Sequence, residues 1–122
     1  NNNSILAKLE YKNFSMLFTG DIEAIAENKI VSKYNNNELK ATVLKVAHHG
    51  SKTSSTQEFI SKVTPKISLI GVGKNNKFGH PNDETVKVLE TYGSIVYRTD
   101  LSGEITLKVR NDNKIQVKTK IK

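Results

Sequence analysis

Apolar and polar residues alternate at both ends of the chain, which is the pattern of half-buried β-strands. Residues 4–10 show it near the start and are followed by a second short apolar run at residues 14–19, and residues 104–109 and 114–120 show it near the end. The second pair is separated by a polar turn at residues 111–113. Each pair therefore predicts a β-hairpin.

Between the hairpins, apolar residues recur at three- and four-residue steps, which predicts helices. The first helix is expected over residues 22–34, with one buried face made of Ile22, Ile25, Ala26, Ile30 and Val31, and the run Asn35-Asn36-Asn37 ends it. The second begins at Ser54 or Ser55, with Glu58 in a capping-box position after Ser55, and Asn82 caps the third.

Strands are expected between these helices because short runs rich in β-branched residues occur at 42–46, 67–72 and 95–98. A turn at residues 100–103 leads from the last of them into the final hairpin. The order predicts one α/β unit: a hairpin, a helix, strands alternating with helices, and a second hairpin.

Composition narrows the possible classes of protein. The chain has 122 residues, of which 36% are hydrophobic and 25% charged, which is typical of one folded domain or part of one. No apolar run approaches the roughly 18 residues of a membrane span, so we expect no membrane insertion by this segment. Because there is no cysteine, any metal must be held by His, Asp or Glu. Residues 1–3 lack the pattern of a signal peptide.

The charge balance favours acidic partners. The net charge is +7, from 19 Lys and Arg against 12 Asp and Glu, and such an excess attracts phosphate-bearing polymers. The alternative is a Lys- and Asn-rich composition without function, because the lysines are scattered along the chain rather than gathered in one block.

Three polar motifs follow predicted strands, where ligand sites gather in α/β folds. Asp21 follows Gly20 at the end of the second strand, although an aspartate there can also simply cap the next helix. His48 and His49 follow the strand at 42–46, and in an extended chain one would bind a metal while the other faces substrate or a second shell. A solvent-exposed histidine pair without function is the alternative.

The third motif is the polar loop at residues 73–81, which contains His80. Its glycines, lysines and amides, including Lys74 and Asn75, could bring backbone N–H groups and cations close to phosphate oxygens. Such a loop can also be only a connection. Because all three motifs end strands of one predicted sheet, we expect them to converge on one edge.

In order and spacing, four segments resemble the second half of the metallo-β-lactamase domain of DNA-internalisation competence proteins. They are residues 18–21 (FTGD), 44–54 (LKVAHHGSKTS), 71–81 (GVGKNNKFGHP) and 96–100 (VYRTD), followed by Gly103. The resemblance implies an α/β fold that is half of an αββα sandwich, a mixed sheet with flanking helices. It also implies two divalent metal ions, Zn²⁺ or Mn²⁺, that activate water for attack on phosphorus.

The resemblance also assigns roles to particular residues. Asp21 matches the bridging metal ligand, and His49 is favoured over His48 as the other ligand. His48 would then contact the phosphate or orient a ligand, and His80 would hold a phosphate oxygen or protonate the leaving group. The remaining matched residues with an expected role in binding phosphate are Ser51, Lys52, Lys74 and Asn75.

One part of the family pattern is absent from these 122 residues. The motif H-x-H-x-D-H and the next histidine ligand would precede Asn1, and only three histidines are present. We therefore expect residues 1–122 to be the C-terminal half of the domain, without its N-terminal half. Alone, it should bind metal weakly or not at all, lack activity, and self-associate through surfaces that the other half would cover.

The function expected from the resemblance is metal-dependent hydrolysis of a phosphodiester, with DNA during DNA uptake as the expected substrate. A parent protein that forms a competence channel would hold this domain at the extracytoplasmic face of a bacterial membrane, and in any other parent we expect it to be soluble. The alternatives are a non-catalytic nucleic-acid-binding module and a small-molecule hydrolase on the same fold.

Overall fold

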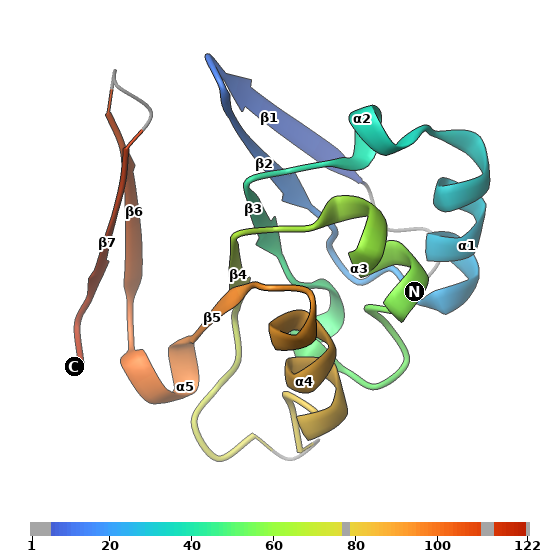
Figure 1. Ribbon diagram of the computed structural model, residues 1–122. Helices are drawn as coiled ribbons and strands as arrows, with labels where there is room; N and C mark the ends of the chain where they lie inside the picture. The colour runs from blue at the N-terminus through green and yellow to red at the C-terminus, as the bar shows by residue number, and fades with distance from the viewer. Residues whose placement is uncertain (1–5, 77–78, 111–113, 122) are drawn as a thin grey trace.

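The computed structural model describes residues 6–76, 79–110 and 114–121, and it builds a three-layered arrangement (Figure 1). Helices lie on one face of a five-stranded sheet, and a separate hairpin stands against the other face. In chain order the elements are β1 (Ala7–Tyr11), β2 (Phe14–Phe18), α1 (Ala24–Lys33), α2 (Asn36–Leu39), β3 (Val43–Lys45), η1 (Ala47–Gly50), α3 (Gln57–Val63), β4 (Ile67–Ile70), α4 (Asp83–Thr91), β5 (Ile95–Arg98), α5 (Thr99–Ser102), β6 (Ile105–Val109) and β7 (Ile115–Thr119).

The five-stranded sheet has the strand order β1-β2-β3-β4-β5. Strands β1 and β2 are antiparallel, whereas β2, β3, β4 and β5 run parallel to one another. The carboxyl ends of these four parallel strands therefore meet at one edge, which we call the carboxyl edge. Loops follow β2, β3 and β4 from Thr19, Val46 and Gly71, whereas β5 leads directly into α5 at Thr99.

The helix face of the sheet carries the larger core. Leu17, Leu44 and Ile70 of the strands are buried against Phe59 and Ile60 of α3. Val63 of α3 and Leu89 of α4 complete the same cluster. This packing follows from the alternation along each strand, which puts every second side chain on the same face.

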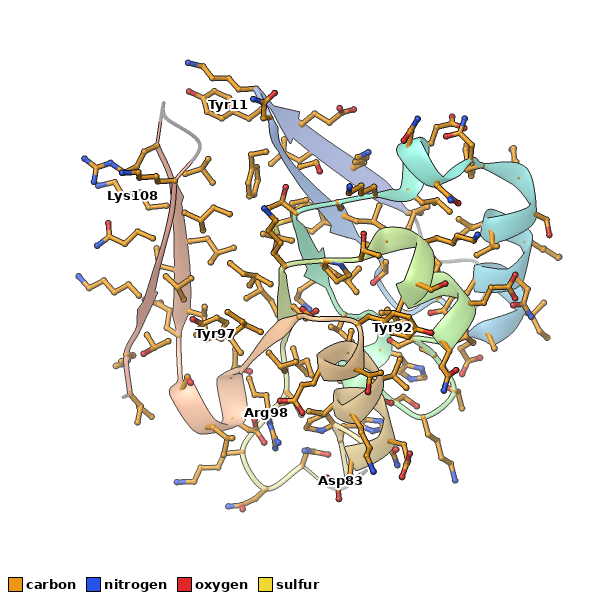
Figure 2. The ribbon with its side chains drawn as sticks, viewed as in Figure 1. Tyr11, Asp83, Tyr92, Tyr97, Arg98 and Lys108 are labelled. Carbon is orange, nitrogen blue, oxygen red and sulfur yellow. The ribbon has the colours of Figure 1, made fainter. Side chains whose placement is uncertain are left out.

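The opposite face of the sheet packs against the β6–β7 hairpin. Phe14, Val43 and Ile67 form a small buried cluster there, and the inward-facing residues of the hairpin pack onto it. These are Leu107, Val109, Ile115 and Val117. Figure 2 shows Tyr97 between the two sheets, in line with its packing against the same cluster.

The α/β class, the mixed sheet and the flanking helices predicted from the sequence are confirmed, as are both hairpins. The first hairpin pairs Leu9 with Met16 and the last pairs Leu107 with Val117. Some predicted features lie outside the described residues: residues 4–5 of the first strand, the turn at 111–113, and residues 77–78 of the polar loop.

Several local predictions were wrong for identifiable reasons. Ile25 is 61% exposed, because the helix begins at Ala24 and turns that position to solvent. The cap of α3 is Thr56, whose side chain accepts the N–H of Phe59, because Ser54 and Ser55 are buried in the preceding loop.

Two expected breaks in regular structure are short helices. Asn35 was expected to end the first helix, but its side chain forms a capping box with Glu38 that starts α2. The turn expected at residues 100–103 is largely the helical turn α5, which begins one residue earlier, at Thr99, and ends before Gly103. Turns and single helical turns share the same polar residues, so sequence pattern separates them poorly.

Candidate functional site at the carboxyl edge

Backbone hydrogen bonds bring the three polar motifs together at the carboxyl edge. The N–H of His48 donates to the carbonyl of Gly20 at 2.9 Å, which joins the loop after β3 to the loop after β2. The N–H of Asn82 donates to the carbonyl of Gly50 at 2.9 Å, which joins the polar loop to the same place. The predicted convergence of Asp21, the histidine pair and His80 is therefore observed.

Gly50 lets the loops come this close. A Cβ atom at Gly50 would lie 2.6 Å from Cβ of Pro81, which no real side chain tolerates. Its φ of +80° also lies in the left-handed region that favours glycine. A residue other than glycine would push the histidine pair away from His80.

The sequence interpretation assumed that the histidine pair lies in an extended chain, and this was wrong. His48 and His49 have φ values of 52° and 54° inside the turn η1, so both occupy the left-handed region. That conformation costs a residue with a side chain about 1–2 kcal/mol. A strained backbone conformation of this kind is kept only where the surrounding structure imposes it. Such conformations are common at functional sites.

His49 has the hydrogen bond expected of a metal-binding histidine. Its Nδ1 lies 2.6 Å from the carbonyl oxygen of Gly71. Because a carbonyl only accepts, Nδ1 carries a proton, and Nε2 is the ring nitrogen that this hydrogen bond does not use. Metal-binding histidines commonly donate their second nitrogen to a backbone carbonyl in this way.

His48 points to different neighbours from those of His49. Its Nδ1 lies 3.5 Å from a carboxylate oxygen of Glu23 and 3.4 Å from the hydroxyl of Thr53. Its ring centre lies 5.9 Å from that of His80. Adjacent histidines are thus separated in direction, although by a left-handed turn rather than by strand alternation.

His80 is held in place by the side chain of Asn76. The Asn76 amide donates to the His80 carbonyl at 2.6 Å and accepts the His80 N–H at 2.9 Å. Burial lowers the pKa of His80 below its ordinary range, and the neighbouring His48 and His49 lower it further. These surroundings therefore favour the neutral form of the His80 imidazole over the protonated form.

Asp21 is exposed at the end of β2, and the capping alternative for it is not observed. The N-cap residue of α1 is Glu23, two positions later. Burial lowers the pKa of Lys45, and the nearby carboxylate of Asp21 partly opposes this effect. Asp21 therefore belongs to the electrostatics of the carboxyl edge.

Lys45 is a candidate functional residue that the sequence interpretation did not single out. It is half-buried at the end of β3, and its Nζ lies 3.2 Å from the position that a Cβ of Gly71 would take. The missing side chain of Gly71 leaves room for this ammonium group. A lysine that interrupts an otherwise apolar strand is the sequence signal that could have found it.

The four predicted phosphate-binding residues differ in their surroundings. Lys52, Lys74 and Asn75 are exposed around the edge, and Asn75 has a φ of +61°. Ser51 is buried, and its hydroxyl lies 3.0 Å from that of Thr53. Ser51 therefore shapes the loop in this structure, and a role for any of the four in substrate binding stays a prediction.

The metal-binding capacity of the described residues is limited. Among residues 6–76, 79–110 and 114–121, no three His, Cys, Asp or Glu side chains are grouped closely enough to hold a metal ion. His49 alone fits a ligand by its hydrogen bonding, and Asp21 lies at the same edge. These donors fit part of a metal site.

Fold and site together define an α/β domain with histidine-bearing loops gathered at the carboxyl ends of its parallel strands. Its sequence is similar to part of ComE operon protein 3 of Bacillus subtilis, with 39% identity over 111 residues, or 91% of this chain. Competence protein ComA of Neisseria gonorrhoeae is 36% identical over 75% of the chain. Recombination protein 2 of Haemophilus influenzae is 35% identical over 80% of it.

At these identities the chain is homologous to a segment shared by competence proteins. It spans 14%, 13% and 12% of the lengths of the three relatives, respectively. No protein-family model matches the chain. In the part of the chain that the structure describes, every helix is too short or too polar to cross a bilayer.

Proposed function

We propose that this chain is the C-terminal half of a metallo-β-lactamase-like phosphodiesterase that acts on DNA during DNA uptake. The observation that carries the proposal is the convergence of Asp21, the histidine pair and His80 at one sheet edge. These are the residues on which the family resemblance rests, and the relatives named as competence proteins support the same biological setting.

In this proposal two of the described residues bind metal. His49 would bind a metal through Nε2, because Nδ1 is committed to Gly71, and Asp21 would supply a carboxylate ligand. When bound, the metals would supply an activated water and neutralise phosphate charge. The remaining ligands would come from a preceding segment of the polypeptide.

His80 and Lys45 would act on the substrate rather than on the metals. A phosphate anion beside His80 would oppose the lowering of its pKa, so substrate binding itself favours the protonated imidazole that a general acid needs. The ammonium group of Lys45, held at the edge beside Gly71, would attract a nonbridging phosphate oxygen.

The test is cleavage of linear duplex DNA by the longer polypeptide that carries this segment, with EDTA or with added Mn²⁺ or Zn²⁺. Cleavage should require the metal. Asp21→Asn and His49→Ala should lose both metal and activity, whereas His80→Ala should lower turnover about a hundredfold or more and keep the metal.

The outcomes separate the proposal from its alternatives. Full metal content and full activity in Asp21→Asn would show that Asp21 is not a ligand. DNA binding without any metal-dependent cleavage would instead identify a non-catalytic binding module. Cleavage of a small ester but not of DNA would indicate a small-molecule hydrolase.

A further inference from the structure

A row of cations covers the side of the β6–β7 hairpin that faces away from the five-stranded sheet. We call this side the outer hairpin face. Its exposed cations are Lys108, Arg110, Lys114, Lys118 and Lys120. Figure 2 shows Lys108 projecting from the hairpin on the side opposite to Tyr97.

The outer hairpin face is oriented by the core on the other side of the hairpin. Leu107 and Val117 pack against the five-stranded sheet, so the residues that alternate with them must point outward. The burial pattern alternates strictly along both β6 and β7, with every outward position exposed. The cations therefore share one surface instead of being scattered around the hairpin.

Cross-strand pairing merges the two strands into one positive strip. Lys108 lies opposite Gln116, and Lys118 lies opposite Thr106. Beyond the paired residues, the N–H of Arg110 donates to the carbonyl of Lys114 at 3.0 Å, which keeps both cations at the same end. Outward residues of one strand are about 7 Å apart, and neighbouring strands about 5 Å, so the cations repel one another.

The other residues of the outer hairpin face indicate which kind of anionic partner could neutralise its positive charge. Thr106 and Gln116 carry side-chain donors suited to phosphate oxygens, and Glu104 is the acidic residue at one end. The outward positions of β6 and β7 carry no apolar or aromatic side chain. A membrane-binding surface would need apolar anchors, and a single-strand-binding surface would need aromatic rings on which bases stack.

We propose that the outer hairpin face binds the phosphate backbone of duplex nucleic acid without sequence selectivity. This contact goes beyond the proposed hydrolysis, because it uses none of the residues of the carboxyl edge and requires no metal. It would hold a long duplex against the domain through counterion release. Binding and cleavage can therefore fail independently of each other.

The test is fluorescence anisotropy of a labelled 20–30 base-pair DNA duplex, titrated with the chain in EDTA at several salt concentrations. The variant Lys108→Gln/Lys118→Gln removes two cations from the outer hairpin face. Its control, Lys29→Gln/Lys87→Gln, removes two exposed cations from α1 and α4 on the other side of the sheet. Both variants have the same net charge, and circular dichroism checks that each is folded.

The hairpin variant should bind the duplex at least about tenfold more weakly at 0.1 M salt, and the slope of log K against log salt should fall by about 1–2. The control should change both values little. Equal losses in the two variants would overturn the proposal, since net charge alone would then explain binding. Binding of anionic phospholipid vesicles but not of duplex by the unmodified chain would overturn it in favour of a membrane surface.

Discussion

At the carboxyl edge, His48 and His49 lie close enough to His80 for their charges to affect its pKa. Burial is the main cause that lowers the pKa of His80, and His48 and His49 add to it. Because a base with a lowered pKa disfavours protonation in the folded state, His80 contributes stability above its unfolded pKa of about 6.5. That contribution is lost as pH falls through the lower, folded pKa.

The prediction concerns the titration of the His80 imidazole, followed by NMR in the unmodified chain. Its pKa should lie below about 6.5, and His48→Ala should raise it because a neighbouring positive charge is removed. Ala substitution of a surface lysine such as Lys29 serves as the control. A His80 pKa that stays the same in His48→Ala would contradict the arrangement of the two rings.

A second residue-scale prediction concerns Gly50, where a side chain would meet Pro81 and would require a left-handed backbone. Gly50→Ala should lower the free energy of unfolding by about 2 kcal/mol or more. Gly73→Ala is the matched control, because no atom lies within 4 Å of its Cβ position. The measurement is urea unfolding. Equal stability of the two variants would show that a glycine at position 50 is not needed for the close contact with Pro81.

At the scale of elements, a buried carboxylate connects α1 to the loop that carries the histidine pair. Glu27 is fully buried in α1 and accepts the N–H groups of Ser55 and Thr56 at 2.6 and 2.8 Å. It therefore holds the end of the loop that leads from the histidines into α3. The hydroxyl of Ser54, the residue before Ser55, donates a hydrogen bond to the Ile22 carbonyl at 2.6 Å. This bond fixes the same loop to the segment just before α1.

Glu27→Ala should destabilise the fold by about 2–4 kcal/mol, because two buried N–H groups lose their acceptor. The control is Glu58→Ala, which removes an exposed carboxylate from α3 and should change stability by less than about 0.5 kcal/mol. Thermal and urea unfolding measure both effects. If Glu27→Ala were as stable as the unmodified chain, the loop would be held by its other contacts.

At the scale of the whole molecule, the hairpin does not cover the full width of the five-stranded sheet. Leu9 and Tyr11 pair with Met16 and Phe14, which lie on the hairpin side of the sheet, and Phe18 is on the same side because it follows Met16 by two positions in β2. All three of Leu9, Tyr11 and Phe18 are nevertheless exposed. Strand β1 is also one of the two edge strands of the sheet. An apolar patch beside an open strand edge favours association.

We therefore predict that the chain self-associates as concentration rises. Leu9→Lys should shift sedimentation toward monomer, because it puts a charge into the patch. Ile25→Lys is the control, since Ile25 is 61% exposed, against 54% for Leu9, but lies on α1. A monomer at all concentrations for the unmodified chain would show that this patch does not drive association.

Sequence pattern alone determined the α/β class, the order of the seven strands and the three longer helices, and the polar motifs at the ends of strands. Alternation marked β6 and β7 correctly, and Asn82 was correctly identified as the cap of α4. These features depend on neighbours within a few residues, so periodicity and capping chemistry are sufficient to reveal them.

Only the tertiary structure decided how those motifs are held. The burial of Glu27, the position of Lys45 beside Gly71 and the left-handed turn of His48 and His49 all depend on contacts between residues far apart in the chain. A buried carboxylate has the same local pattern as an exposed one, because the N–H groups that stabilise it come from another loop. The candidate site was therefore predicted as a set of residues, whereas its geometry came from packing.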